Sequence, residues 1–311
     1  MTNLKNKKVL ITGITGFIGA HLEKKLAKLG AEVFGVSTTK AGKNILTANI
    51  ADFSPLSEFI AKHKIEICFH LAGESLVESG QKDPYHTFKT NVLGTLNVLE
   101  SARLHGLEKI VIASTSHVYG NSVVPYLEEY PPRPSRPYET SKTATDLITQ
   151  SYATTFSLPV FIPRFTNIYG PGDLNFSRLI PKIMKNIALN EAVSMWGGAA
   201  KRSFLYIDDA IEAYIKLALA DPQKVGHNRI FNFGHAELVS IKELIQKAIQ
   251  LSGKKIPIEE SNQERPLEIP EQYVSFQKAQ NTLDWSPEVS LELGLQKTYS
   301  WYSQYLSHKK E

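Results

Sequence analysis

The amino-acid sequence predicts an α/β fold, in which a doubly wound parallel sheet is followed by a smaller C-terminal α/β subdomain. Short, continuous apolar runs alternate with stretches of helical period through the first half of the chain, a pattern typical of parallel strands buried on both faces. The first apolar run leads directly into a glycine-rich loop, Gly13–Gly19, and then into a helical stretch. After Phe165 the alternation weakens and turn residues become more frequent.

The predicted elements of the first half alternate regularly between strand and helix. Strands are predicted at Lys8–Thr12, Glu32–Val36, Ile65–Leu71, Lys109–Ala113 and Leu158–Phe165, and helices at Phe17–Leu29, Leu56–His63, Thr87–His105 and Thr140–Phe156. Because the strand runs are apolar, helices are expected to cover both faces of their sheet. Successive strands should therefore be joined by right-handed crossovers.

Composition and charge exclude several classes of protein. The 311 residues carry a formal net charge of +4 with scattered Lys and Arg, which does not favour a nucleic-acid binder. The single cysteine, Cys68, excludes a disulfide framework and a multi-cysteine metal site. No run approaches the roughly 20 apolar residues of a membrane helix, and no signal-peptide pattern is present. We therefore expect a soluble, cytoplasmic protein that does not bind a metal or a membrane.

The glycine loop has the spacing and the context of a dinucleotide-binding loop. Its three glycines lie between a strand and a helix, where they permit a tight turn, close approach of a pyrophosphate and close packing of the helix. The helix start offers backbone N–H groups and a positive dipole end to the phosphates. The residues expected to contact the cofactor here are Gly13, Thr15, Gly16, Phe17, Ile18 and Gly19.

The end of the second strand bears on the choice between NAD and NADP. NAD-binding proteins usually carry an acidic residue there, which hydrogen-bonds the ribose 2′-hydroxyl. Here Ser37-Thr38-Thr39-Lys40 follows, with Lys43 nearby and no carboxylate. The Ser37 hydroxyl and the Lys40 cation suit a 2′-phosphate, which favours NADP slightly over NAD. The alternative is that both lysines belong to an ordinary solvated loop.

A tyrosine and a lysine four residues apart form a second candidate motif. Tyr138 and Lys142 would share one face at the start of a helix, where the ammonium favours a phenolate that acts as a base. Thr115 follows the strand Lys109–Ala113, at the strand end where open α/β sheets bind ligands. A hydroxyl there can hydrogen-bond both the tyrosine and a substrate.

Together these motifs resemble the extended short-chain dehydrogenase/reductase superfamily, in its nucleotide-sugar epimerase/dehydratase group. Further matches are Phe69–Gly73, Asn91–Thr95, Arg164–Gly172, Arg202–Asp209, Arg265-Pro266 and Leu283–Pro287. The resemblance therefore extends over nearly the whole chain. It implies an enzyme that binds NAD or NADP in a Rossmann domain and acts on a nucleotide-diphosphate (NDP) sugar.

The resemblance also implies roles for individual residues. Thr115, Tyr138 and Lys142 would form the catalytic set with support from Asn91, and Asn49 and Ile50 would contact the adenine. Further cofactor contacts are implied for Leu71, Ala72 and Gly73, and NDP-sugar contacts for Ser116, Asn167, Arg178, Arg202 and Arg265. An arginine fork suits the oxygens of a diphosphate, although each arginine has the alternative of being a surface cation. Of these arginines, Arg202 is the one we favour as a ligand of the substrate.

The same resemblance implies a division of the chain and an assembly. Residues 1–165 would form the dinucleotide-binding domain, with returning segments near 204–235, and residues 166–311 mainly the NDP-sugar-binding subdomain. Phe204–Ala220 and Ser240–Leu251 are expected to be further strand or helix units. A homodimer would form through the helices Thr87–His105 and Thr140–Phe156.

The reaction class depends on the two residues after Thr115. Enzymes of this group oxidise the sugar at C4. A 4,6-dehydratase then needs an acid and a base, usually Asp-Glu, where this chain has Ser116 and His117. Their absence favours an NDP-hexose 4-epimerase, although segments including Gly172–Pro181 resemble CDP-glucose 4,6-dehydratases and an imidazole such as that of His117 can act as a base. A 4,6-dehydratase, a 4-ketosugar reductase and a catalytically silent cofactor-binding regulator remain alternatives.

Overall fold

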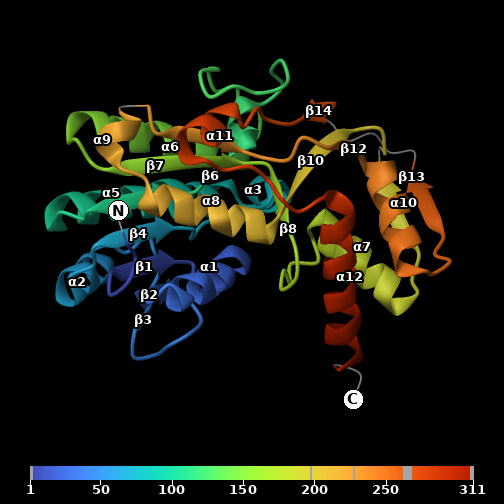
Figure 1. The fold of residues 1–311 in the computed structure, drawn as a ribbon, viewed down its shortest axis with the longest axis horizontal. Coiled ribbons are helices and arrows are strands. Elements are labelled where there is room, and N and C mark those ends of the chain that lie inside the picture. Colours follow the sequence, from blue (N-terminus) through green and yellow to red (C-terminus); the bar gives the residue numbers. More distant parts are fainter. Residues whose placement is uncertain (1–2, 197, 227, 262–267, 309–311) are drawn as a thin grey trace.

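The computed structural model describes residues 3–196, 198–226, 228–261 and 268–308, and Figure 1 shows their fold. The main sheet has eight strands within these ranges, all paired in parallel. They are β1 (Lys8–Thr12), β2 (Glu32–Ser37), β3 (Ile45–Thr47), β4 (Ile67–His70), β5 (Lys109–Ile112), β6 (Ser114–Thr115), β7 (Val160–Phe165) and β11 (Ile230–Phe233). Their order is β11-β7-β5-β4-β1-β2-β3, with β6 paired to β7, so the strand order reverses at β1 and the predicted doubly wound sheet is confirmed.

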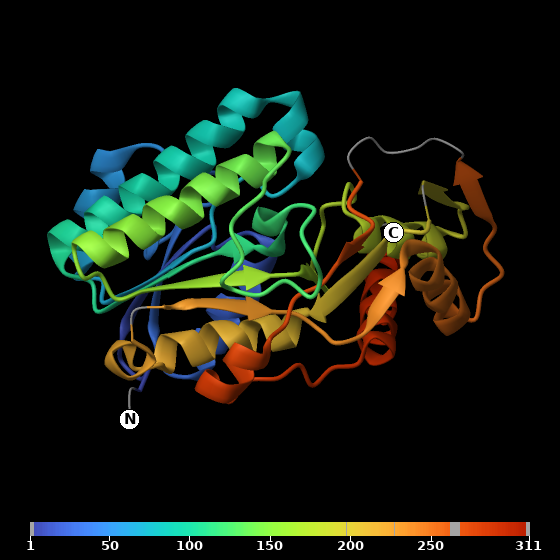
Figure 2. The same ribbon diagram turned by 90° about the horizontal axis from the view of Figure 1, so that it is seen from above.

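Helices cover both faces of this sheet. One layer contains α2 (Phe53–His63), α5 (Gly94–His105) and α6 (Pro137–Thr155), and the opposite layer contains α1 (Phe17–Lys28), α8 (Ile207–Leu219) and α11 (Gln277–Leu283). In Figure 2, α5 and α6 lie side by side along one outer surface of the molecule, and α8 lies on the other side of the sheet. The continuous apolar strands are thus buried on both sides, as their sequence requires.

Two of the predicted helices differ from the observed ones near the carboxyl edge of the sheet. The expected helix Thr87–His105 is wrong as a single α-helix: α4 (Pro84–Phe88), a π-helical turn at Lys89–Leu93 and then α5 replace it. The π turn contains Asn91, whose carbonyl accepts from Thr145 of α6 and whose side chain bonds to Glu74 and Ser141. Helix α6 begins at Pro137, three residues earlier than expected, because Glu139 caps its first turn.

The second half of the chain builds a smaller α/β unit beside the carboxyl edge of the main sheet, at the right in Figure 1. A four-stranded sheet contains β8 (Asn167–Tyr169), β10 (Lys201–Tyr206), β12 (Leu238–Ser240) and β14 (Glu271–Gln272), and a separate pair contains β9 (Val193–Trp196) and β13 (Ile258–Ser261). The helices of this unit are α7 (Leu179–Leu189), α10 (Ile241–Ser252) and α12 (Leu291–Ser307). Helix α8 and strand β11 lie between β10 and β12 in the sequence but belong to the main domain, where α8 packs on the main sheet and β11 pairs with β7.

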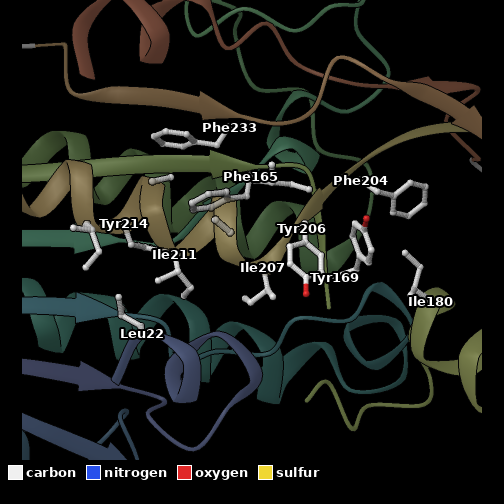
Figure 3. Close-up of a cluster of buried hydrophobic side chains, with 14 of the residues drawn as sticks. Leu22, Phe165, Tyr169, Ile180, Phe204, Tyr206, Ile207, Ile211, Tyr214 and Phe233 are labelled. Atoms are coloured by element: carbon white, nitrogen blue, oxygen red, sulfur yellow. The ribbon is translucent and has the colours of Figure 1, made fainter. Parts of the chain in front are cut away.

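The hydrophobic core runs through both halves. Along β1, Val9 and Ile11 face one cluster of buried side chains, whereas Leu10 faces the other. The larger cluster is continuous from Leu22 of α1 to Phe204 of β10, and Figure 3 shows a part of it. The two units therefore share packed side chains. None of the described helices is long and apolar enough to span a bilayer.

Candidate active site

The glycine loop lies at the carboxyl end of β1, against the loop that follows β4. Gly13 has φ +73°, and a Cβ on it would lie 2.9 Å from the backbone N of Ala72. A Cβ on Gly19 would lie 2.3 Å from the Gly13 carbonyl oxygen, so a side chain here would push α1 away from the loop. The N-cap of α1 is Gly16, which has no side chain to occupy the N–H groups of the first turn, where Phe17 and Ile18 lie. This cradle fits the pyrophosphate of a dinucleotide.

The turn after β2 is organised by the Ser37 hydroxyl. The Ser37 side chain is buried, with its Oγ 3.0 Å from Thr15 Oγ1, and it accepts the backbone N–H groups of Thr39 and Lys40 at 3.2 Å. The Lys40 side chain is exposed. Most of the hydrogen-bonding capacity of Ser37 is therefore used within the protein, and the charge of this turn lies on its lysines.

A buried histidine connects the glycine loop with the helix behind it. His70 Nδ1 lies 2.7 Å from Thr12 Oγ1, and Nε2 lies 2.9 Å from Thr95 Oγ1. Because the Thr95 hydroxyl donates to the Asn91 carbonyl, it accepts from His70, which assigns the proton to Nε2. Burial lowers the pKa of His70 to about 3, so the ring is neutral. Both ring nitrogens of His70 therefore have a hydroxyl partner, Thr12 on one side and Thr95 on the other.

The loop after β4 is anchored by the same network. The N–H groups of Leu71 and Ala72 donate to Thr12 Oγ1 at 3.2 Å. Gly73 lies against Asn91, whose Oδ1 would be 2.7 Å from a Cβ at this position. The three predicted cofactor residues of this loop thus lie together beside the glycine loop.

Asn49 and Ile50 occupy different environments at the far side of β2. Asn49 is exposed, and its Oδ1 accepts the Ala51 N–H at 2.9 Å, which closes a local turn. Ile50 is buried against Gly94 at the start of α5, and its carbonyl accepts from Asn97 at 3.1 Å. Their expected contact with an adenine stays a prediction.

The predicted catalytic residues converge where α6 begins. Tyr138 lies in the first turn of α6, with Thr115 of β6 nearby. Both residues are 8% exposed. Burial raises the pKa of Tyr138, whereas the Thr115 side chain and the charge of Arg178 lower it. Lys142 follows one turn later; its Nζ donates to the Ala113 carbonyl at 2.6 Å, and burial lowers its pKa to about 8.

Asn91 supports the backbone of Tyr138 and does not contact the phenol. Its Nδ2 donates to Ser141 Oγ at 2.9 Å, and the Ser141 hydroxyl donates to the Tyr138 carbonyl at 2.7 Å. Its Oδ1 accepts the Glu74 N–H at 2.8 Å. On the other side, a Cβ on Gly80 in α3 (Val77–Lys82) would lie 3.0 Å from the Tyr138 backbone N. The first turn of α6 is therefore held from two directions.

A buried ion pair behind Thr115 was not identified from the sequence. Arg164 of β7 donates through Nε and Nη2 to the two carboxylate oxygens of Asp146, both at 2.9 Å. Ser114 donates to the same carboxylate at 2.8 Å, and Arg164 Nη1 donates to the Tyr119 hydroxyl at 2.9 Å. This network joins β6, β7 and α6. The sequence does contain a sign of this ion pair, because Arg164 lies inside an apolar strand and a buried arginine needs an acidic partner.

His117 lies beside Tyr138, with a second unpredicted residue, Glu139, next to it. The His117 and Tyr138 ring centroids are 5.9 Å apart, and the backbone N–H of His117 donates to Thr115 Oγ1 at 3.3 Å. His117 Nδ1 lies 3.6 Å from Glu139 Oε1. Burial alone would raise the pKa of Glu139, but the His117 imidazole and the hydrogen bonds from Ser135 lower it to about 2. Glu139 could have been identified as a helix-capping residue, because it is an acidic residue at the third position of a helix.

The predicted substrate residues are more dispersed. Arg178 precedes α7 and donates to Asp173 Oδ2 at 2.9 Å and to Ser75 Oγ at 2.6 Å, so it bridges the loops after β4 and β8. Its positive charge lowers the pKa of Tyr138. Ser116 is buried directly after Thr115.

Arg202 and Asn167 lie on the smaller sheet. Arg202 of β10 donates through Nη2 to Glu268 Oε1 at 2.5 Å, and its side chain is largely buried. Asn167 is half-buried in β8, which pairs with β10. Arg265 lies outside the described residues. Within the described ranges, no group of three or more His, Cys, Asp and Glu side chains is arranged to hold a metal ion.

Comparisons with known proteins agree with this arrangement. The model of the NAD dependent epimerase/dehydratase family matches residues 9–234. The chain is 28% identical over 315 residues to UDP-glucuronate 4-epimerase of Thermodesulfobacterium geofontis, covering 94% of this chain and 95% of that protein. It is 32% identical over 323 residues to UDP-N-acetyl-alpha-D-glucosaminuronate decarboxylase of Bacillus cytotoxicus, covering 96% and 98%.

A solved structure extends the likeness to three dimensions. The crystal structure of UDP-glucuronic acid 4-epimerase from Bacillus cereus, in complex with UDP-glucuronic acid and NAD, matches with a TM-score of 0.87 and 26% identity. The match covers 96% of this chain and 99% of that one. The likeness therefore includes the main sheet and the smaller C-terminal unit.

Proposed function

Because the chain belongs to the NAD dependent epimerase/dehydratase family, we propose that it is an NDP-hexose 4-epimerase that transiently oxidises the sugar at C4. The observation that carries this proposal is the convergence of Thr115, Tyr138 and Lys142 at the start of α6. Asn91 connects this turn to the loop that packs against the glycine loop. The relative and the structural neighbour named as UDP-glucuronate 4-epimerases support the substrate class.

The three residues have separate tasks at the C4 hydroxyl. A bound nicotinamide dinucleotide supplies the acceptor and the donor for the hydride. Tyr138 takes the hydroxyl proton as the ketone forms and returns it when the epimer is reduced. Thr115 orients the phenol and the sugar hydroxyl through its own hydroxyl. The Lys142 ammonium favours the phenolate, against the burial that raises the pKa of Tyr138.

The cofactor proposal is a modest preference for NADP. The described turn after β2 presents no carboxylate from Ser37 to Lys43, and both of its lysines are exposed. A cation there can pair with a 2′-phosphate, whereas a 2′-hydroxyl lacks its usual acidic acceptor. The dissociation constants for NADP⁺ and NAD⁺ test this preference, which a tighter NAD⁺ complex would reverse. Lys40→Ala should weaken NADP⁺ binding only.

The substrate proposal places the NDP-sugar between the catalytic cluster and the smaller sheet. Residues 166–311 would contribute Asn167, Arg178 and Arg202 as its principal ligands, with Arg265 in addition. Ser116, adjacent to Thr115, would contact the sugar. The positions of Arg178 near Tyr138 and of Arg202 on β10 support contacts to two separate parts of the ligand.

A 4,6-dehydratase is the second candidate, because His117 occupies the place of the usual base and contacts a carboxylate. The first candidate is favoured because Ser116 has no acidic group to protonate a leaving hydroxyl. A 4-ketosugar reductase would use the same Thr115, Tyr138 and Lys142 but would consume NADPH.

We also propose a homodimer through α5 and α6. Leu104 of α5, Leu147 of α6 and Phe156 at the C-cap of α6 are 52%, 50% and 46% exposed, respectively. Figure 2 shows these helices side by side on an outer surface, where a second copy can pack against them. Sedimentation of the unmodified chain and of Leu147→Glu tests the proposal: a dimer that the substitution dissociates supports it, and a monomer contradicts it.

The reaction is tested with UDP-glucose, UDP-glucuronic acid, dTDP-glucose and CDP-glucose, each with NAD⁺ or NADP⁺, by reading products with NMR. A 4-epimer is the expected product. A 4-keto-6-deoxy sugar would instead identify the protein as a 4,6-dehydratase. Stoichiometric consumption of NADPH with a 4-ketosugar would indicate a reductase. Cofactor binding with no product from any sugar would indicate a silent binding protein.

A further inference from the structure

The first turn of α6 contains a buried carboxylate that faces an unpaired imidazole nitrogen. Only 1% of the Glu139 side chain is exposed. Its Oε2 accepts the Ser135 N–H and hydroxyl at 2.9 Å and the Arg136 N–H at 3.2 Å. Its Oε1 faces His117 Nδ1 at 3.6 Å, and this nitrogen is buried without a hydrogen-bond partner. A buried polar atom left in this way calls for an explanation, and a role in catalysis is one.

The charge of Glu139 determines which nitrogen of His117 carries the proton. A carboxylate only accepts hydrogen bonds, so its Oε1 favours a proton on Nδ1 of His117 and leaves a lone pair on Nε2. The His117 side chain is 23% exposed although its Nδ1 is buried, so the accessible part of the ring is the edge away from Glu139. That ring lies beside Tyr138 at 5.9 Å, where the C4 ketone would form.

We propose that Glu139 is a positioning residue that makes Nε2 of His117 the base for a hydrogen on a carbon next to the C4 ketone. This inference rests on the proposed function, because only oxidation at C4 makes such a hydrogen acidic. Nε2 takes the proton, and the electron pair of the C–H bond moves into the bond to C4. Negative charge then develops on the C4 oxygen beside Tyr138 and Thr115. Return of a proton from His117 restores the ketone, and nothing is oxidised or reduced in this step.

Glu139→Gln is a sharp test because the amide can still cap α6 but favours the opposite tautomer of His117. Its oxygen can remain with the three donors from Ser135 and Arg136. Its NH₂ group then faces His117 and donates to Nδ1, which places the proton on Nε2 and removes the lone pair. Ser135→Ala is the matched control, because it removes one donor to Oε2 and leaves the contact with His117 unchanged.

The measurement uses the full chain in heavy water with its cofactor and UDP-glucuronic acid or UDP-glucose. NMR follows deuterium at the carbons next to C4, and the 4-epimer is quantified in the same samples. Glu139→Gln and His117→Gln should each lower deuterium incorporation about 100-fold, and this loss should exceed any loss of 4-epimer formation at least about tenfold. Ser135→Ala should keep both rates within about twofold of the unmodified chain.

The possible results separate the two proposals. Epimerisation without any deuterium in the unmodified chain overturns this inference and leaves the C4 epimerase standing. Equal losses of label and of epimer in Glu139→Gln also overturn it, because Glu139 would then only hold the start of α6. If no sugar gives any product, the C4 epimerase is wrong and this inference falls with it.

Discussion

The two sides of the candidate site satisfy their polar groups in different ways. On the cofactor side, the hydrogen-bonding partners are neutral. Thr12, His70 and Thr95 are hydrogen-bonded in series, and the Ser37 hydroxyl accepts two backbone N–H groups. On the substrate side, cations are paired with carboxylates, Arg178 with Asp173 and Arg202 with Glu268. The cofactor side is therefore organised before a ligand arrives, whereas the proposed anionic substrate would compete with these carboxylates for Arg178 and Arg202.

The largest expected effect concerns the catalytic cluster between the two sides. Tyr138→Phe removes the proton acceptor and keeps the ring, so turnover should fall about 1,000-fold. The dissociation constant of the cofactor should stay within about twofold, because the glycine loop is untouched. Steady-state kinetics and a cofactor titration measure the two quantities. Retention of more than a tenth of the activity would contradict the assignment.

The next effect tests whether the cofactor side is rigid. Gly19→Ala places a Cβ 2.3 Å from the Gly13 carbonyl, so α1 must move away from the loop. We expect cofactor affinity to fall about 100-fold, which is ~2.7 kcal/mol. Gly106→Ala is the control: Gly106 has φ +65° with no atom within 4 Å of its Cβ, so only stability should fall, by ~1–2 kcal/mol. Equal cofactor affinities in the two variants would show that the loop adapts.

A smaller effect tests exchange of partners on the substrate side. Arg202→Met should raise KM for the NDP-sugar about tenfold, because a charge-assisted hydrogen bond is lost. Glu268→Gln should lower KM about threefold, because the negative charge that Glu268 places against Arg202 is removed. KM for the cofactor should be unchanged in both variants. If Glu268→Gln instead raises KM, the carboxylate positions Arg202 for the substrate and does not compete with it.

The last prediction concerns the pH dependence of stability and involves no change in ligand binding. Burial lowers the pKa of Lys142 to about 8, below its ordinary value of 10.5. Between these values the unfolded chain holds a proton that the folded chain has lost, so this residue adds stability as pH rises through that window. Relative to Lys142→Met, the unmodified chain should gain in free energy of unfolding from pH 8 to 10.5. Urea titrations at several pH values measure it, and a constant difference would refute the shift.

The cofactor side was the more predictable because its information is local. A strand, three glycines and a helix are contiguous, and a buried parallel strand has to be apolar throughout. The parallel sheet and the position of the site at its carboxyl edge can therefore be predicted from short contiguous stretches of sequence. Thr115, Tyr138 and Lys142 were also predictable, since each lies at the end of a strand or at the start of a helix.

The remaining features depend on partners that are distant in the sequence. The π turn at Asn91 forms where its side chain meets Glu74 and Ser141, and no local pattern specifies it. Glu139 is one of three residues between Tyr138 and Lys142, and its role appears only when His117 is brought next to it. Arg202 was predicted as a ligand, but its partner Glu268 lies 66 residues away.

The core that runs from Leu22 to Phe204 limits how new specificities can arise in this chain. A chimera that joined residues 1–165 to the second half of a relative would break packed contacts of α8 and β11 with the main sheet. Shuffling of whole halves should therefore give mostly misfolded products. Change is tolerated better in the loop around Ser75, which is exposed. Asp173, in contrast, is buried and holds both Arg178 and Tyr302. Directed evolution of substrate choice would best begin by diversifying the loop around Ser75.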